Sequence, residues 1–219
     1  MYQKISIIAF LITFCAIGLS NIIWPGTGSL RNPLKTLAHL FTLPFLEQKL
    51  SLTGAFRKLV YLIALICFLV LAITGFYPTL VLGEHISGYL VMIHATFAPI
   101  FAVCIAILAV MWAWNCRFNN KDWPWFQRLV ERITLIKSTE QPQIKATCLG
   151  QKISFWLIIF LTLPLALSIV LSMLPYFGTQ WQDLFLFIHR YIALIFALIV
   201  IVHTHLIAVS YTHLRAHET

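Results

Sequence analysis

Charged residues are scarce in this sequence. Aspartate, glutamate, lysine and arginine make up 10% of the 219 residues, whereas 60% are hydrophobic. Soluble domains carry about 25% charged residues, so this composition excludes an ordinary soluble domain. The mean hydropathy of +0.89 agrees, and the chain is predicted to be an integral membrane protein.

Acidic residues and paired cysteines are also lacking. The chain has 7 acidic and 15 basic residues, which gives a formal net charge of +8. The basic residues gather in two loops rather than along a helix face between stacking aromatics, so positive-inside topology explains them and no nucleic-acid partner is expected. The five cysteines form no C-x-x-C pair, which argues against a disulfide framework and a cysteine-ligated cluster.

Long apolar runs, by contrast, are frequent. They cover residues 5–20, 59–76, 88–114, 153–174 and 183–209, and they predict membrane-spanning helices. Pro78 should end the second helix, Pro99 should kink the third, and Pro164 should interrupt the fourth. The predicted fold is an all-α membrane protein, a four-helix transmembrane bundle with one extra N-terminal transmembrane helix.

The domain boundaries follow from these runs. Residues 1–24 are predicted to be a transmembrane anchor or a signal peptide, 25–57 a cytoplasmic linker, 58–209 the four-helix domain and 210–219 a non-native tail. Residues 21–58 hold five basic and one acidic residue (5 − 1 = +4), and residues 115–152 hold seven and three (7 − 3 = +4). Such loops stay in the cytoplasm, which favours a retained anchor with a periplasmic N-terminus and a cytoplasmic C-terminus.

Four histidines lie inside the predicted spans, namely His94, His189, His203 and His205. His189 and His203 are 14 residues apart, which returns to within roughly 40° of the same helix face after a rise of about 21 Å. His94 and His189 should lie at equal depth on antiparallel neighbours. Histidine inside a membrane is a candidate functional residue, and this arrangement suggests stacked b-type haems with axial imidazoles as iron ligands. The alternative is that each histidine only forms a hydrogen bond with a neighbouring helix.

The neighbours of these histidines offer further candidates. Arg190 could pair with a haem propionate, or its side chain could extend to the membrane interface. His205 lies about 160° around the helix from His203 and is a reserve candidate. No histidine lies at the depth of His203 on another span, where the chain offers Tyr61, Ser154 or, if the first loop folds back, His39. Tyr61 is either a haem ligand or an interfacial anchor.

Several motifs together resemble a known family. They are Thr74-Gly75 at the end of the second span, His94 in the third, Asp122-Trp-Pro-Trp125, Gly150-Gln-Lys-Ile-Ser-Phe-Trp156, and the histidines at 189 and 203. Over about residues 58–208 the chain resembles the cytochrome b (gamma) subunit of respiratory formate dehydrogenases and the related di-haem subunits of hydrogenases and thiosulfate reductases.

The resemblance implies roles for individual residues. His94 and His189 match the pair that holds the outer haem, and His203 matches a ligand of the inner haem. Gly150 and Gln151 match the edge of the quinone pocket. The chain departs from the family at Tyr61, where the family has a histidine, and at Cys148, where it commonly has an asparagine. Both departures fall at the inner haem and quinone site.

The predicted function is that of an electron-transfer subunit in the bacterial inner membrane rather than of the substrate dehydrogenase itself. Electrons would pass from a periplasmic-side partner through haem b to menaquinone or ubiquinone, and the partners would be iron-sulfur and catalytic subunits and membrane lipid. Two alternatives stay open. One is a paralogue that keeps only the outer haem, and the other is a non-redox membrane assembly or transport protein.

Overall fold

The computed structural model describes residues 1–23, 51–119, 146–176 and 178–215. In these ranges the regular secondary structure is helical, and five helices are long and apolar enough to cross a membrane. The elements are α1 (Tyr2–Ile23), α3 (Leu52–Tyr77), the π-helical turn η2 (Pro78–Leu82), α4 (Tyr89–Trp112), α6 (Ala146–Met173) and α7 (Thr179–Arg215). The prediction of an all-α membrane protein is therefore confirmed for the described residues.

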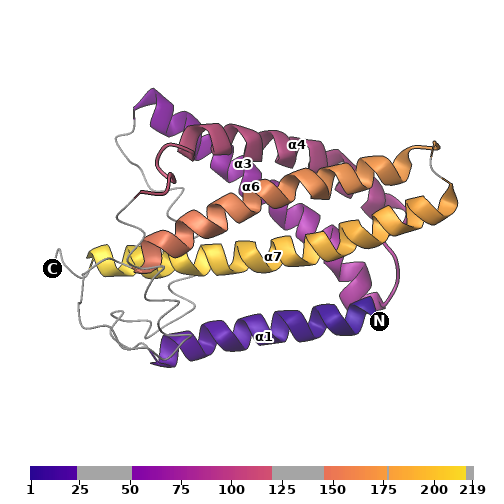
Figure 1. Cartoon of the computed structure of the whole chain (residues 1–219), viewed down its shortest axis with the longest axis horizontal. Coiled ribbons are helices and arrows are strands. Elements are labelled where there is room, and N and C mark those ends of the chain that lie inside the picture. The colour runs from indigo at the N-terminus through magenta and orange to yellow at the C-terminus, as the bar shows by residue number, and fades with distance from the viewer. Residues whose placement is uncertain (24–50, 120–145, 177, 216–219) are drawn as a thin grey trace.

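The helices pack as two antiparallel pairs with one helix at the edge (Figure 1). α3 packs against α4, and α6 packs against α7 along much of their lengths. α4 also contacts α6, which joins the two pairs, while α1 lies beside α7 and η2. The N-terminus of α1 therefore sits near the point where α3 and η2 end.

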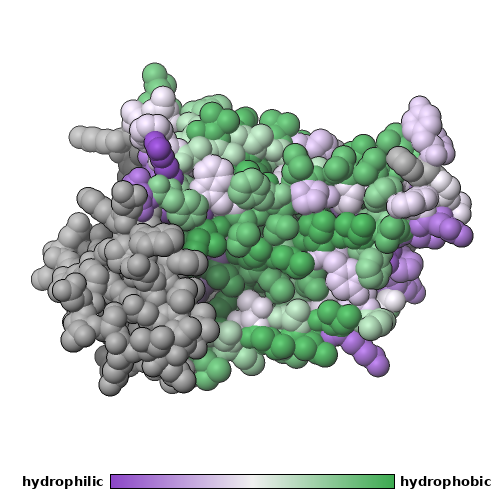
Figure 2. Space-filling model, in the orientation of Figure 1, coloured by the Kyte–Doolittle hydropathy of each residue, from purple (hydrophilic) through white to green (hydrophobic). Residues whose placement is uncertain are grey.

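The outer surface of the bundle is apolar. Large hydrophobic side chains are exposed on every spanning helix, among them Leu11, Ile66, Val103, Leu163 and Ile195. Figure 2 shows hydrophobic residues over the middle lengths of the helices and hydrophilic ones toward their ends. In water such a surface would be an aggregation hazard, whereas in a bilayer it faces lipid. The chain is a multi-pass membrane protein.

One proline prediction was confirmed and another was wrong. α3 ends at Tyr77, directly before Pro78, as predicted, but helical structure continues past this proline as the π-helical turn η2, in which Pro78 occupies the first position. The helical segment ends instead at Gly83, whose φ of 72° suits glycine and whose amide donates to the Pro78 carbonyl. α6 runs through Pro164 without a break, as membrane helices can when neighbouring groups satisfy the freed carbonyl.

Four helices begin earlier than their apolar runs indicated: α1 at Tyr2 rather than at residue 5, α3 at Leu52 rather than at residue 59, and α6 and α7 as follows. α6 is helical from Ala146 rather than from residue 153, so Gly150 and Gln151 lie within a helix. α7 begins at Thr179 rather than at residue 183. In α6 and α7 polar residues continue the helix beyond its apolar part, which hydropathy alone does not detect. His39 and residues 125–136 lie outside the described residues, as do the side chains of Cys148 and of residues 208–215.

Candidate functional site

Two of the predicted histidines line one cavity between the helix pairs. His94 comes from α4 and His189 from α7, and the space between them measures about 660 Å³, including a part that is open to the outside. We call it the two-histidine cavity. Its remaining walls are apolar, and all four helices of the bundle contribute small residues to them: Ala72, Ala98, Ala102, Ala166, Ala193 and Ala197. Small side chains here leave room for a broad, flat group between the helices.

A buried hydroxyl fixes the orientation of His94. The Thr74 Oγ1 atom lies 2.9 Å from Nδ1 of His94 and donates its own proton to the Val70 carbonyl at 2.7 Å. A hydroxyl has one proton, so Thr74 accepts a hydrogen bond from Nδ1–H of His94. The proton of this neutral imidazole therefore sits on Nδ1, and Nε2 keeps a free lone pair.

His189 is held in the same tautomer as His94, with the proton on Nδ1. Its Nδ1 lies 3.0 Å from the Leu165 carbonyl oxygen and 3.3 Å from Oγ of Ser168. A carbonyl oxygen only accepts, so Nδ1 carries the proton. Ser168 donates to the same Leu165 carbonyl at 2.9 Å. Both histidines of this cavity therefore have an Nε2 atom that is free to bind a metal, which is the arrangement in which outer hydrogen bonds orient metal ligands.

The Thr74-Gly75 pair has a steric role as well. A Cβ atom at Gly75 would lie 3.2 Å from Cε1 of His94, closer than ordinary van der Waals contact. Thr74 therefore holds the ring by a hydrogen bond, and Gly75 leaves the space in which the ring lies.

This contact leads to a prediction with a matched control. Alanine in place of a helical glycine stabilises a helix by about 1 kcal/mol, so Gly18→Ala, where nothing lies within 4 Å, should raise the melting temperature in detergent. Gly75→Ala should lose that gain and alter the visible spectrum of any group bound to His94, because the ring must move. Equal stabilisation by both substitutions, with unchanged spectra, would contradict the proposed contact.

α1 packs on two walls of the two-histidine cavity. The Tyr2 hydroxyl donates to the Arg190 carbonyl at 2.9 Å, next to His189 in the chain. Gln3 donates to the Leu80 carbonyl in η2 at 3.2 Å. Further along α1, Phe10 meets Phe76 edge to face with ring centroids 5.3 Å apart, and Phe76 lines the cavity. The extra N-terminal helix therefore stabilises α7 and the end of α3 at this site.

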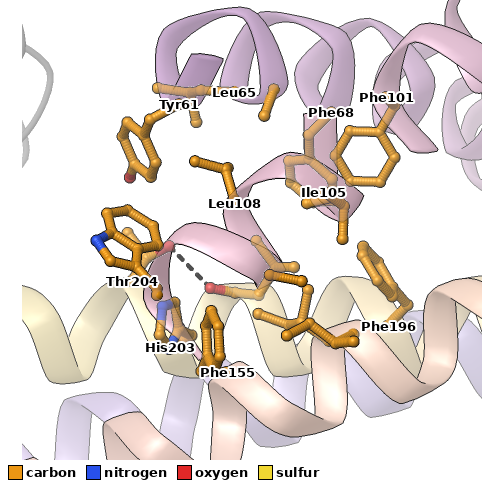
Figure 3. Close-up of a pocket in the computed structure, with 16 residues that line it drawn as sticks. Tyr61, Leu65, Phe68, Phe101, Ile105, Leu108, Phe155, Phe196, His203 and Thr204 are labelled. Carbon is orange, nitrogen blue, oxygen red and sulfur yellow. Dashed lines mark hydrogen bonds between the residues drawn. The ribbon is translucent and has the colours of Figure 1, made fainter. Parts of the chain in front are cut away.

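His203 lines a second cavity (Figure 3), which we call the one-histidine cavity. It encloses about 670 Å³, and Tyr61 is part of its wall. The buried Ser154 lies 2.6 Å from Nδ1 of His203 and donates to the Gly150 carbonyl at 2.8 Å. Ser154 therefore accepts from Nδ1–H, as Thr74 does at His94. The sequence offered Ser154 as a group across the cavity from His203, but it binds the outer side of the ring.

An aromatic layer separates the two cavities. Phe68, Phe101 and Phe196 line both cavities, and their ring centroids lie 5.9–6.2 Å from one another. Figure 3 shows these three rings together at one end of the one-histidine cavity. A group bound in either cavity would lie against this layer.

The other predicted residues lie away from the two cavities. Gln151 donates to the Leu206 carbonyl at 3.0 Å, and a Cβ atom at Gly150 would lie 3.0 Å from Cδ1 of Leu206, so both residues join α6 to α7. Arg190 uses its carbonyl to accept from Tyr2, and His205 is not among the residues that line either cavity.

These residues fit haem b. A haem needs apolar surroundings and imidazole nitrogens with free lone pairs, and the two-histidine cavity provides both. A family profile described as prokaryotic cytochrome b561 matches residues 52–219, which is most of the chain. The chain belongs to the prokaryotic cytochrome b561 family. It is a membrane cytochrome b of electron transfer, and this family binds haem b.

The match to the cytochrome b561 family covers α3, α4, α6 and α7 and therefore both cavities. It includes all three candidate ligands, His94, His189 and His203. α1 lies outside the matched residues, although it packs on the two-histidine cavity. A comparison with curated proteins found no match.

Proposed function

We propose that this cytochrome b561 family member is the membrane subunit of a respiratory oxidoreductase similar to formate dehydrogenase. In this role it receives electrons from iron-sulfur and catalytic partner subunits and passes them through haem b to the quinone pool. One observation carries the proposal. His94 and His189 come from different helices, line one apolar cavity, and each use Nδ1 as a hydrogen-bond donor, so their two Nε2 atoms would be free to bind haem iron.

The ligand set favours haem over a bare metal ion. A porphyrin supplies four of the six iron ligands, so two imidazoles complete the coordination. A bare transition metal ion needs three or more protein ligands, and in the described parts of the chain no three histidine, cysteine, aspartate or glutamate side chains come together.

The protein residues have three tasks around the haem. Haem b, when bound, supplies a one-electron redox couple. Thr74 and the Leu165 carbonyl orient the two imidazoles, and their hydrogen bonds raise the basicity of the ligands. The apolar walls exclude water and lower the local dielectric constant, which favours the less charged oxidation state of the haem.

Charge distribution supports the orientation proposed for the membrane. Arg57, Arg117 and Lys152 lie where α3 starts, α4 ends and α6 starts, and a 3.0 Å hydrogen bond from Trp156 to the Cys116 carbonyl joins the latter two points. The acidic Glu84 and Asp183 lie at the opposite end. By the positive-inside rule the basic end is cytoplasmic, so the two-histidine cavity lies toward the periplasm, where the partner subunits would deliver electrons.

The proposal is tested on the purified full chain in detergent. Pyridine haemochrome absorbance should show b-type haem, and the electron paramagnetic resonance spectrum of the oxidised protein should be that of low-spin ferric haem, because two imidazoles fill both axial positions. His205→Ala should leave both measurements unchanged. A chain without haem, or one with only high-spin haem, would overturn the proposal.

A further inference from the structure

The one-histidine cavity differs from its neighbour in the chemistry of its walls. It has a single imidazole and only two alanines, Ala64 and Ala109, where the two-histidine cavity has six. Bulky aromatic residues replace the small ones. Tyr61 packs edge to face on Trp112 with centroids 6.1 Å apart, and Trp112 packs on Phe155 at 6.5 Å. With one imidazole in its lining, this cavity lacks the second ligand with which the two-histidine cavity can hold haem iron.

The polar groups of this cavity gather at one end. Figure 3 shows Tyr61, His203 and Thr204 at the end opposite to the three shared phenylalanines. The Thr204 hydroxyl donates its proton to the Val200 carbonyl at 2.8 Å, so this proton is not available to a bound molecule. Between the two ends the wall holds Trp112, Phe155 and six large aliphatic side chains, those of Leu65, Ile105, Leu108, Ile158, Ile159 and Val200. The cavity therefore fits a molecule with a small polar head and an apolar body.

The two groups left at the polar end are complementary. His203 presents a free Nε2 acceptor, because Ser154 holds its Nδ1–H. The Tyr61 hydroxyl makes no hydrogen bond within the described residues, so it is available as a donor. A quinone oxygen accepts a hydrogen bond, and the hydroxyl of the reduced form donates one. Tyr61 can therefore donate to the oxidised form and His203 can accept from the reduced form, so the polar end of the cavity can hold either redox form.

We infer that the one-histidine cavity binds the headgroup of an isoprenoid quinone rather than a second haem, with the Tyr61 hydroxyl and Nε2 of His203 as its hydrogen-bonding partners. This inference rests on the proposed function, because the electrons would come from haem in the two-histidine cavity. Within the described part of the chain, Phe68, Phe101 and Phe196 then form the layer that lies between the two bound groups. The isoprenoid tail lies along the aliphatic side chains of the wall.

The test measures haem and quinone separately on the haem-loaded full chain. We expect about one haem per chain and saturable binding of the fluorescent quinone analogue heptyl-hydroxyquinoline N-oxide, displaced by decylubiquinone. Tyr61→Phe and His203→Leu should each weaken this binding about tenfold, the effect of one lost hydrogen bond at about 1.4 kcal/mol. The haem spectrum should stay unchanged, which shows that the variants are folded.

Matched controls are Tyr89→Phe, at the exposed start of α4, and His205→Leu, outside both cavities. Two haems per chain, one of them lost in His203→Leu, would overturn the inference and leave the proposed function standing. Binding of the analogue that is the same in all four variants would also overturn it. Absence of haem would instead overturn the proposed function. The inference can be tested separately, because binding of the analogue is measured from the analogue's own fluorescence and not from the haem.

Discussion

Replacing His189 by alanine is expected to remove most of the haem from the purified protein, and His94→Ala should do the same. The two residues lie on α7 and α4, so each supplies one of the two imidazoles of the two-histidine cavity. Loss of an outer hydrogen-bonding partner of a metal ligand already weakens binding about 10–100-fold, and loss of the ligand itself should exceed that. Haem per chain, measured as the reduced pyridine haemochrome, is the readout.

His205→Ala is the matched control, because it removes an imidazole from the same helix without touching either cavity. Helical content by circular dichroism shows whether a variant is folded. The assignment would be wrong if His94→Ala and His189→Ala retained a full complement of low-spin haem.

Tyr61→His is expected to add a haem, raising the content from about one to about two per chain. The one-histidine cavity has nearly the same volume as the two-histidine cavity, about 670 against 660 Å³. His203 already presents a free Nε2 from the α7 side. Histidine at 61 would supply an imidazole from α3, which also contributes to the wall. The added haem should be low spin, and binding of the quinone analogue should be lost.

Two variants separate the gain of a second haem ligand at position 61 from the loss of the tyrosine hydroxyl and from the addition of a histidine elsewhere. Tyr61→Phe removes the hydroxyl without adding a ligand, and Tyr89→His adds a histidine at an exposed position; neither should gain haem. If Tyr61→His also gains none while remaining folded, the bulk of Trp112 and Phe155 excludes a porphyrin from this cavity whatever ligands are present.

The membrane spans and the pairing of His94 with His189 could be predicted from the sequence for one reason. In a lipid bilayer, depth is a one-dimensional coordinate that residue number determines at 1.5 Å per residue. Apolar runs mark the spans, and equal depth on antiparallel helices brought the two histidines together. The structure places both in the same cavity, while the role of that cavity as the haem site stays a prediction.

The hydroxyls that hold the histidines could not be predicted in this way. Thr74 reaches His94 across the interface of α3 and α4, and Ser154 and Ser168 reach α7 from α6. Such contacts depend on how far each helix is rotated about its axis, which depth does not determine. A usable signal was present, because a hydroxyl in an apolar span needs a hydrogen-bonding partner. These three hydroxyl residues are buried, with 4–5% exposure.

The contacts of α1 with the rest of the bundle could not be predicted from the sequence either. Its contacts are made by Tyr2, Gln3 and Phe10 with residues far along the chain, and nothing in a uniformly apolar run indicates which neighbours it selects.

The position of α1 has a consequence for biosynthesis. Ribosomes make α1 before α7, yet the Tyr2 hydroxyl donates to the carbonyl of Arg190, a residue of α7. Until α7 has been made, this contact of α1 cannot form, and the α7 wall of the two-histidine cavity, with His189, is missing. Cofactor loading into this cavity therefore requires that α7 has been made and inserted.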